Sequence, residues 1–163
     1  MFASLRAAGV AALLALGLVG MSAPAHALKP GAPHSGVVAV KSAYALDETL
    51  ARLKADIAAK GIVLFSEIDQ SKLAKGANIV LRPSTLLVFG NPGLGSHFIT
   101  ADPRAGLDWP VRLLVVEDEN KQVWALYTDF GYIAKRHGIA DREAEFKMAS
   151  AVIASITSAV AAK

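Results

Sequence analysis

The hydrophobic pattern beyond residue 35 predicts short strands alternating with amphipathic helices. Runs rich in apolar and β-branched residues at 36–42, 62–68 and 85–89 predict three strands. The third run is continuously apolar, which indicates a central strand with both faces covered. Between the first two runs we expect a helix that packs on the sheet and ends at Gly61. Its large apolar residues recur at helical spacing: Leu46, Leu50, Leu53 and Ile57.

The second half of the chain predicts a β-hairpin followed by helices. Strands at 111–117 and 122–128 are separated by four polar residues, 118–121, which have the length of a hairpin turn. Asp129 is expected to cap a helix over 130–137.

A final helix and two shorter helical segments complete the prediction. Asp141 is expected to cap the final helix, which should cover the sheet. Short helical segments are expected at 69–76 and 94–101, the second ending before Pro103. One face of the final helix is apolar: Phe146, Ala149, Ile153, Ile156 and Val160.

These elements indicate one folded domain over residues 36–163. Strands and helices are mixed without strict βαβ alternation, and the sequence contains no internal repeat. We therefore expect the α+β class.

The first 27 residues have the pattern of a secretory signal peptide. Arg6 precedes an almost wholly apolar stretch at 7–19, and Ala25-His26-Ala27 offers small residues at cleavage spacing. The apolar stretch is roughly 13 residues, shorter than the ~20 of a membrane span, which favours cleavage over an uncleaved anchor. Residues 28–35, rich in proline and glycine, are expected to form a flexible leader. The sequence therefore predicts a periplasmic or secreted protein.

Charge and cysteine content narrow the chemistry. The net charge is +3, and the basic residues are scattered rather than gathered into a stripe with aromatics, so no nucleic-acid partner is predicted. The chain has no cysteine, which excludes disulfides, thiol catalysis and thiolate metal sites. Stability must come from burial of apolar surface.

Several short motifs, in their order and spacing, resemble the domain-of-unknown-function family 302. The similarity covers residues 37–139, and it implies a TATA-binding-protein-like α+β fold with helices on one face of a mostly antiparallel sheet. The activity of that family is not established. The motifs are Arg82-Pro83 with Leu86 to Pro92 (LLVFGNP), Leu107-Asp108-Trp109-Pro110, Val116-Glu117-Asp118 and Arg136-His137-Gly138.

Two departures from the family pattern stand out. Many relatives carry a histidine where this chain has Gln70, and a Gly-Thr-x-Leu-Met run where it has Gly95 to Ile99 (GSHFI). A role that depends on either family feature does not transfer to this chain.

The glycine-rich stretch from Gly90 to Ser96 (GNPGLGS) admits two interpretations. It is a plain strand-to-helix turn, or its amides capture an anion at a helix start. A P-loop requires Lys and then Ser or Thr after the last glycine, where Ser96 and His97 stand, so a nucleotide site is not predicted. The candidate ligand-binding residues here are Asn91, Gly93, Gly95, Ser96 and His97.

An enzyme would need an acid–base pair drawn from His97, Asp102, Asp108 and His137, because proton transfer near neutral pH requires a tunable imidazole and an orienting carboxylate. Structural roles could also account for these residues without any catalysis. His137 is expected to favour a helix C-terminus, and Asp108 to hydrogen-bond its own turn. No histidine pair has helical metal-ligand spacing, and no cofactor is predicted.

Aromatic residues supply the remaining candidates. Most are expected in the core, and one or two are hypothesised to face a groove between sheet and helices that binds a small amphipathic molecule. The set is Phe89, Trp109, Trp124, Tyr127 and Tyr132. Of these, Trp109 and Trp124 join Asp108 and His137 among the candidate ligand-binding residues.

The sequence therefore predicts an exported, non-catalytic ligand-binding or assembly module, with homodimerisation open. The alternatives are a small enzyme that uses His97 or His137 with Asp102 or Asp108, and a metal or haem carrier that gathers ligands around His97. An enzyme predicts an imidazole and a carboxylate together in a concave site. A binding module predicts an apolar groove that lacks them.

Overall fold

The computed structural model describes residues 35–162. The predicted signal peptide, and all of the predicted leader except Ser35, lie outside the described residues. Within 35–162, no helix combines the length and the apolar composition needed to cross a membrane.

The five strands form one antiparallel sheet in the order β1-β5-β4-β3-β2. Their bounds are β1 Val37–Lys41, β2 Val63–Asp69, β3 Ser84–Gly90, β4 Val111–Glu117 and β5 Val123–Thr128. The predicted hairpin of β4 and β5 is confirmed. The prediction that 85–89 forms a central strand is confirmed, because β3 pairs with β2 on one side and with β4, the middle strand, on the other. An apolar run indicates that a strand is interior, but it does not give the place of that strand in the sheet. The strand β3 is interior because β2 pairs with its outer side.

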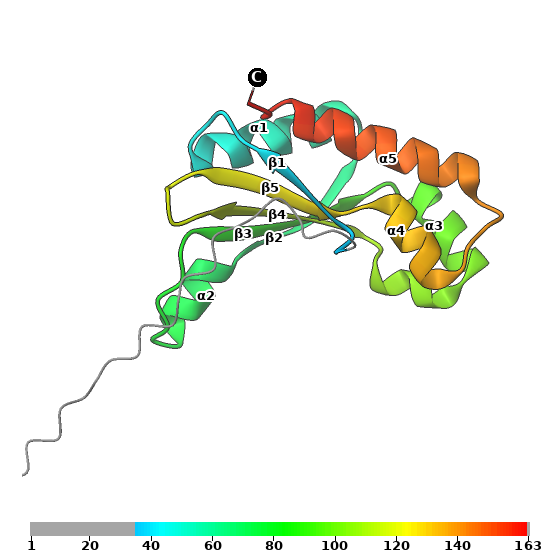
Figure 1. Cartoon of the computed structure of the whole chain (residues 1–163), viewed down its shortest axis with the longest axis horizontal. Helices are drawn as coiled ribbons and strands as arrows, with labels where there is room; N and C mark the ends of the chain where they lie inside the picture. The colour runs from blue at the N-terminus through cyan, green and yellow to red at the C-terminus, as the bar shows by residue number, and fades with distance from the viewer. Residues whose placement is uncertain (1–34, 163) are drawn as a thin grey trace, which may run out of the picture.

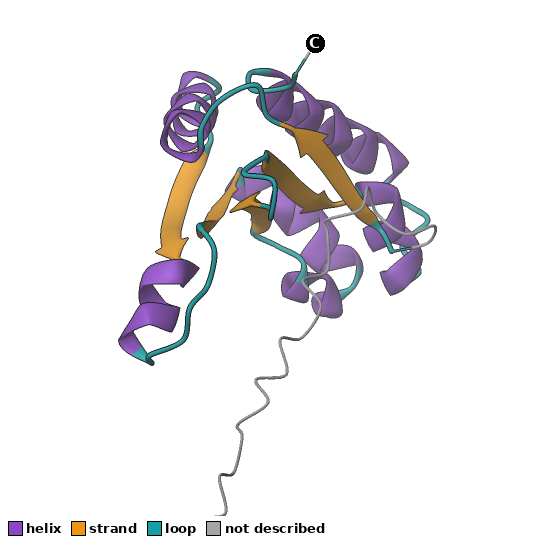
Figure 2. Ribbon diagram, turned by 60° about the vertical axis from the view of Figure 1, so that its left-hand side comes forward, coloured by secondary structure: helices purple, strands orange, loops and turns teal. Residues whose placement is uncertain are grey.

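Two long helices cover one face of the sheet (Figure 1). They are α1, Leu46–Ala59, and α5, Glu143–Ser158. Three shorter segments gather at one end of the molecule: α3 Pro92–Ala101, a 3₁₀ turn Pro103–Leu107 and α4 Phe130–His137. The short helix α2, Gln70–Gly76, lies apart at the other end of the sheet (Figures 1 and 2). The α+β prediction is confirmed: the order is β-α-β4-α with short helices inserted between the strands.

The core fills the space between the sheet and the two long helices. Strand side chains alternate, so that Leu87 of β3 lies opposite Leu113 of β4 on the covered face, and both are fully buried. Leu53 and Ile57 of α1 are also buried, as the helical spacing predicted. The apolar face of α5 is buried as expected: Phe146, Ala149, Ile153, Ile156, with Val160 just beyond the helix.

Side-chain caps fix most helix starts. The Asp129 carboxylate accepts a hydrogen bond from the Tyr132 amide at 2.8 Å, which confirms it as the N-cap of α4. The predicted cap of the final helix is wrong, because the N-cap position of α5 is Arg142 and carries no side-chain cap. Asp141 is held instead by the neighbouring guanidinium, Arg142 Nη1 to Oδ2 at 2.6 Å. The prediction considered only the helix amides as partners for Asp141 and not the adjacent arginine.

Candidate functional site

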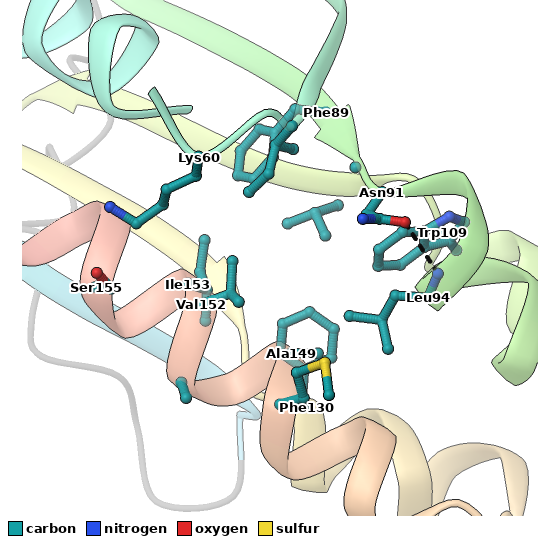
Figure 3. Close-up of a pocket in the computed structure, with 15 residues that line it drawn as sticks. Lys60, Phe89, Asn91, Leu94, Trp109, Phe130, Ala149, Val152, Ile153 and Ser155 are labelled. Carbon is teal, nitrogen blue, oxygen red and sulfur yellow. Dashed lines mark hydrogen bonds between the residues drawn. The ribbon is translucent and has the colours of Figure 1, made fainter. Parts of the chain in front are cut away.

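An apolar pocket of about 410 Å³ opens between one end of the sheet, α3 and α5 (Figure 3). This volume lies within the range of roughly 300–1,000 Å³ typical of small-molecule sites. The lining comes from widely separated parts of the chain: Lys60, Ile62, Phe89, Gly90, Asn91, Leu94, Trp109, Val111, Phe130, Met148, Ala149, Ala151, Val152, Ile153 and Ser155.

One wall of the pocket is built around the indole of Trp109. A Cβ atom added at Gly90 would come within 2.8 Å of this ring, and one at Gly95 would overlap it outright. The two glycines therefore let the indole lie directly on the backbone of β3 and α3. Behind it, Phe98 lies 5.7 Å away between ring centroids, and Phe98 in turn packs against Phe146 at 4.4 Å.

The opposite wall is the alanine-rich face of α5. Ala149 is buried and Ala151 is exposed, and both line the pocket beside Val152 and Ile153. A methyl group fills much less space than the leucine or phenylalanine that commonly packs a helix onto a sheet. Alanine at these positions therefore contributes to the open volume.

The polar groups of the pocket lie at its rim. Lys60, the C-cap residue of α1, lies at one end of the pocket, and its Nζ lies 2.6 Å from Asp56 Oδ2. Asn91 accepts a hydrogen bond from the Leu94 amide through Oδ1 at 3.1 Å and so caps α3. Figure 3 shows its amide nitrogen turned toward the pocket. No aspartate or glutamate is among the described residues that line this space.

A separate group of charged side chains, the Asp108 cluster, lies beside the pocket and consists of Asp108, Arg112, Arg136 and His137. His137 Nε2 lies 2.7 Å from Asp108 Oδ2, and both side chains are more than nine-tenths buried. Arg136 Nη1 and Arg112 Nη2 approach Asp108 Oδ1 at 3.2 and 3.4 Å. Arg112 also donates to the carbonyl of Leu107.

The Asp108 cluster contains the imidazole and carboxylate that an acid–base enzyme would use, but it is closely packed. The cavity beside it holds only about 10 Å³, about the smallest space that admits one water molecule. The prediction that Asp108 hydrogen-bonds its own turn is wrong, because its oxygens bind partners from β4 and α4 instead. His137 does end a helix, as expected.

The other acid–base candidates do not join this cluster. His97 is exposed on α3, with Nδ1 4.0 Å from Glu145 Oε1. Asp102 caps the 3₁₀ turn and pairs with Arg104 at 2.6 Å. Hydrogen bonds from the Arg104 side chain and amide lower the pKa of Asp102 from 3.8 to about 2.

The glycine-rich stretch forms the end of β3 and the first turns of α3, which is the strand-to-helix interpretation. The Leu94 amide donates its hydrogen bond to the Asn91 side chain. Ser96 donates to the carbonyl of Pro92 at 2.7 Å, and Gly93 is exposed within the helix. Gly95 is buried against the indole.

Of the predicted ligand-binding residues, the structure brings Asn91 and Trp109 into the pocket, with Gly95 supporting the wall from behind. Trp124 lies elsewhere, because its Nε1 donates to Asp118 Oδ2 at 2.9 Å on the hairpin. That hydrogen bond is the main reason that the pKa of Asp118 is lowered. Sequence reasoning missed Lys60 and the small side chains of α5. The alanine-rich face was the available signal for the latter.

No three histidine, aspartate or glutamate side chains within 35–162 are arranged to hold a metal ion.

The fold defines a small α+β domain with one antiparallel sheet. A family model described as "Domain of unknown function DUF302" matches residues 38–161, so the chain belongs to this family. The match runs through α5. The final helix is therefore part of the family domain, and the expected limit at residue 139 was too short.

A solved structure has the same fold. The crystal structure of an uncharacterised conserved DUF302 protein from Bacillus stearothermophilus aligns with a TM-score of 0.70 at 13% sequence identity, covering 77% of this chain and 98% of that one.

Curated relatives include proteins named fluoride-specific ion channels. FluC 1 of Brucella suis biovar 1 is 35% identical over 105 residues, covering 64% of this chain and 41% of the relative. FluC 2 of Brucella melitensis biotype 1 has the same identity over the same length, covering 39% of the relative. The chain thus spans about two fifths of these relatives.

Proposed function

We propose that this domain binds a small, largely apolar molecule in the pocket between α3 and α5, without catalysing a reaction on it. The observation that carries the proposal is the pocket of about 410 Å³ lined by Phe89, Trp109 and Phe130. The catalytic-looking pair lies outside this space and is enclosed by its own partners. A binding module needs open apolar volume, which the pocket supplies.

Filling the pocket from α5 tests this function. Ala151→Phe places a ring in the pocket from an exposed helix position and should abolish binding of the neutral fluorescent probe N-phenyl-1-naphthylamine. Ala154→Phe is the matched control, because Ala154 is exposed on the same helix but does not line the pocket. Equal probe binding by both variants would refute the assignment of this pocket.

Export is part of the proposal. The positive start, apolar stretch and small-residue cleavage pattern of residues 1–27 support secretion. N-terminal sequencing of the protein purified from its own host should begin near Leu28. A mature protein that retains Met1 in the cytoplasm would contradict this expectation.

A second candidate function, self-assembly, is favoured by the edge strand β2. Strand β2 pairs on one side with β3, and its apolar residues Val63, Leu64 and Phe65 are 46%, 38% and 48% exposed. Leu73 of α2 and Val80 beyond it are further exposed apolar residues near the other end of β2. Edge strands with exposed apolar residues pair readily with another strand, and we propose a second copy of this chain as that partner.

Light scattering after gel filtration tests the assembly. The wild-type protein should be a dimer, and Phe65→Lys a monomer. The control Ile99→Lys, at an exposed apolar position on α3, should leave the dimer intact. A monomeric wild-type protein across the micromolar range would remove this candidate function and leave ligand binding untouched.

A further inference from the structure

We infer that the molecule bound in the pocket is a single-chain amphiphile whose anionic head lies beside Lys60, with its apolar chain between α5 and the Trp109 wall. This inference rests on the proposed binding function and narrows it to a ligand class. A fatty-acid-like carboxylate has the required chemistry.

The position of Lys60 is the first argument. It follows the last turn of α1 and precedes Gly61, whose φ of 65° turns the chain toward β2. The side chain therefore leaves the helix at the pocket rim, and Figure 3 shows it at one end of the pocket, directed toward the segment of α5 that carries Ser155. The methylene groups of a lysine can cover apolar surface while the ammonium group stays in water.

The charge balance around the pocket is the second argument. Lys60 is the one charged side chain among the described residues of the lining, and its carboxylate partner, Asp56, lies outside the lining. Asn91 turns its amide nitrogen, a hydrogen-bond donor, toward the same space. The cation at one end of the rim therefore complements a head group that carries negative charge, whereas the Asn91 amide donor lies at the other end of the pocket in Figure 3.

The existing ion pair leaves room for such a head group. Asp56 binds Lys60 Nζ at 2.6 Å from the preceding turn of α1, and the two side chains are 24% and 29% exposed. An ammonium group has three donor hydrogens, and a partly exposed pair of this kind contributes little stability. A ligand carboxylate can therefore share the ammonium group with Asp56 or displace it.

The experiment compares ligands with the same chain and different heads. Displacement of N-phenyl-1-naphthylamine by dodecanoate, dodecanol and dodecyltrimethylammonium is measured at pH 7.5, with the two ionic ligands below their critical micelle concentrations and dodecanol below its solubility limit. We expect dodecanoate to bind about five- to tenfold more tightly than dodecanol, as a partly exposed charge-assisted contact provides. The cation should bind most weakly.

Two variants separate the head group from the chain. Lys60→Met should reduce the preference for dodecanoate over dodecanol to near unity, whereas Asp56→Asn should raise that preference. The control Lys54→Met removes another lysine of α1, which pairs with Glu67 and does not line the pocket. That variant should behave as wild type.

The outcomes distinguish this inference from the function on which it rests. Equal affinity for dodecanoate and dodecanol in the wild-type protein overturns the anionic head while the apolar pocket stands. A dodecanoate preference that survives in Lys60→Met also overturns it. If the probe and all three ligands fail to bind, the proposed function falls and this inference falls with it.

Discussion

Asp108 and Trp109 are consecutive residues that belong to different regions, and the two regions contrast sharply. Asp108 enters a cluster in which its oxygens have three cationic or imidazole partners and the adjoining cavity is about 10 Å³. Trp109 faces a pocket of about 410 Å³ with apolar walls. One region resembles an active site in composition but is full, whereas the other lacks reactive groups but is open.

The comparison shows that residue type is a weaker guide to function than unfilled space. A buried carboxylate requires compensating partners in any protein, so an Asp–His contact arises readily where a helix end meets a loop. The pocket is an apolar depression that opens to the surface, and its free volume suits a small ligand. We therefore propose that the function lies in the pocket and that the Asp108 cluster attaches α4 to the rest of the domain.

The largest predicted effect is a loss of folding stability when the Asp108 cluster is disrupted. Asp108→Ala should lower the free energy of unfolding by about 3 kcal/mol, because it leaves a buried imidazole and two guanidinium groups without their shared anion. Urea denaturation measures the change. Arg136→Ala, which removes a half-exposed partner, should cost under about 1 kcal/mol. An Asp108→Ala protein as stable as wild type would contradict the structural role and revive the enzyme alternative.

A smaller loss is predicted for the wall of the pocket. Gly95→Ala adds a methyl group where the indole of Trp109 lies, and overpacking of this kind costs about 1–3 kcal/mol. The displaced ring should also weaken probe binding. Gly93→Ala is the control two residues earlier in α3, where a Cβ would meet only the Asn91 side chain at 3.2 Å. Thermal unfolding that ranks Gly93→Ala below Gly95→Ala would refute the tight packing of the indole.

The smallest effect concerns pH and lies outside both regions. The pKa of Asp102 falls from 3.8 to about 2 in the folded protein because Arg104 donates to its carboxylate. A lowered pKa in the folded state contributes stability above the unfolded value, and that contribution is lost as the pH falls from about 4 to about 2. In Asp102→Asn, the free energy of unfolding should therefore change less between about pH 4 and about pH 2 than in the wild-type protein. Its dependence on pH near neutrality should be unchanged. Denaturant midpoints between pH 2 and pH 7 test it, and an unchanged acid limb would contradict the Arg104 contact.

The sequence predicted the elements well because their signals are local. Helical spacing placed the buried face of α1, and a four-residue polar turn placed the hairpin of β4 and β5. Errors arose where distant or competing partners decide the outcome. The strand order, with β4 in the middle, depends on pairing between strands far apart in sequence and was not predicted. The predicted cap of α5 is wrong, and Asp141 contacts Arg142 instead.

The candidate site was predicted only in part for the same reason. Asn91 and Trp109 belong to conspicuous motifs, and both line the pocket. Lys60 carries no local signal, since an exposed lysine after a helix is ordinary. Asp108 and His137 are 29 positions apart in the chain, and no periodicity could indicate that their side chains meet.

The two glycines beneath the Trp109 ring have a consequence for how the specificity of such a domain can change. Because the Trp109 ring lies directly on the backbone at Gly90 and Gly95, a larger residue at either glycine would collide with it. The shape of this wall of the pocket is therefore hard to change by substitution. On the facing helix, exposed pocket-lining positions such as Ala151 can carry longer side chains without disturbing the sheet, whereas Ala149 and Ile153 are packed against it. Under the proposed binding function, we expect ligand preference to be altered most readily by substitutions at these exposed positions of α5.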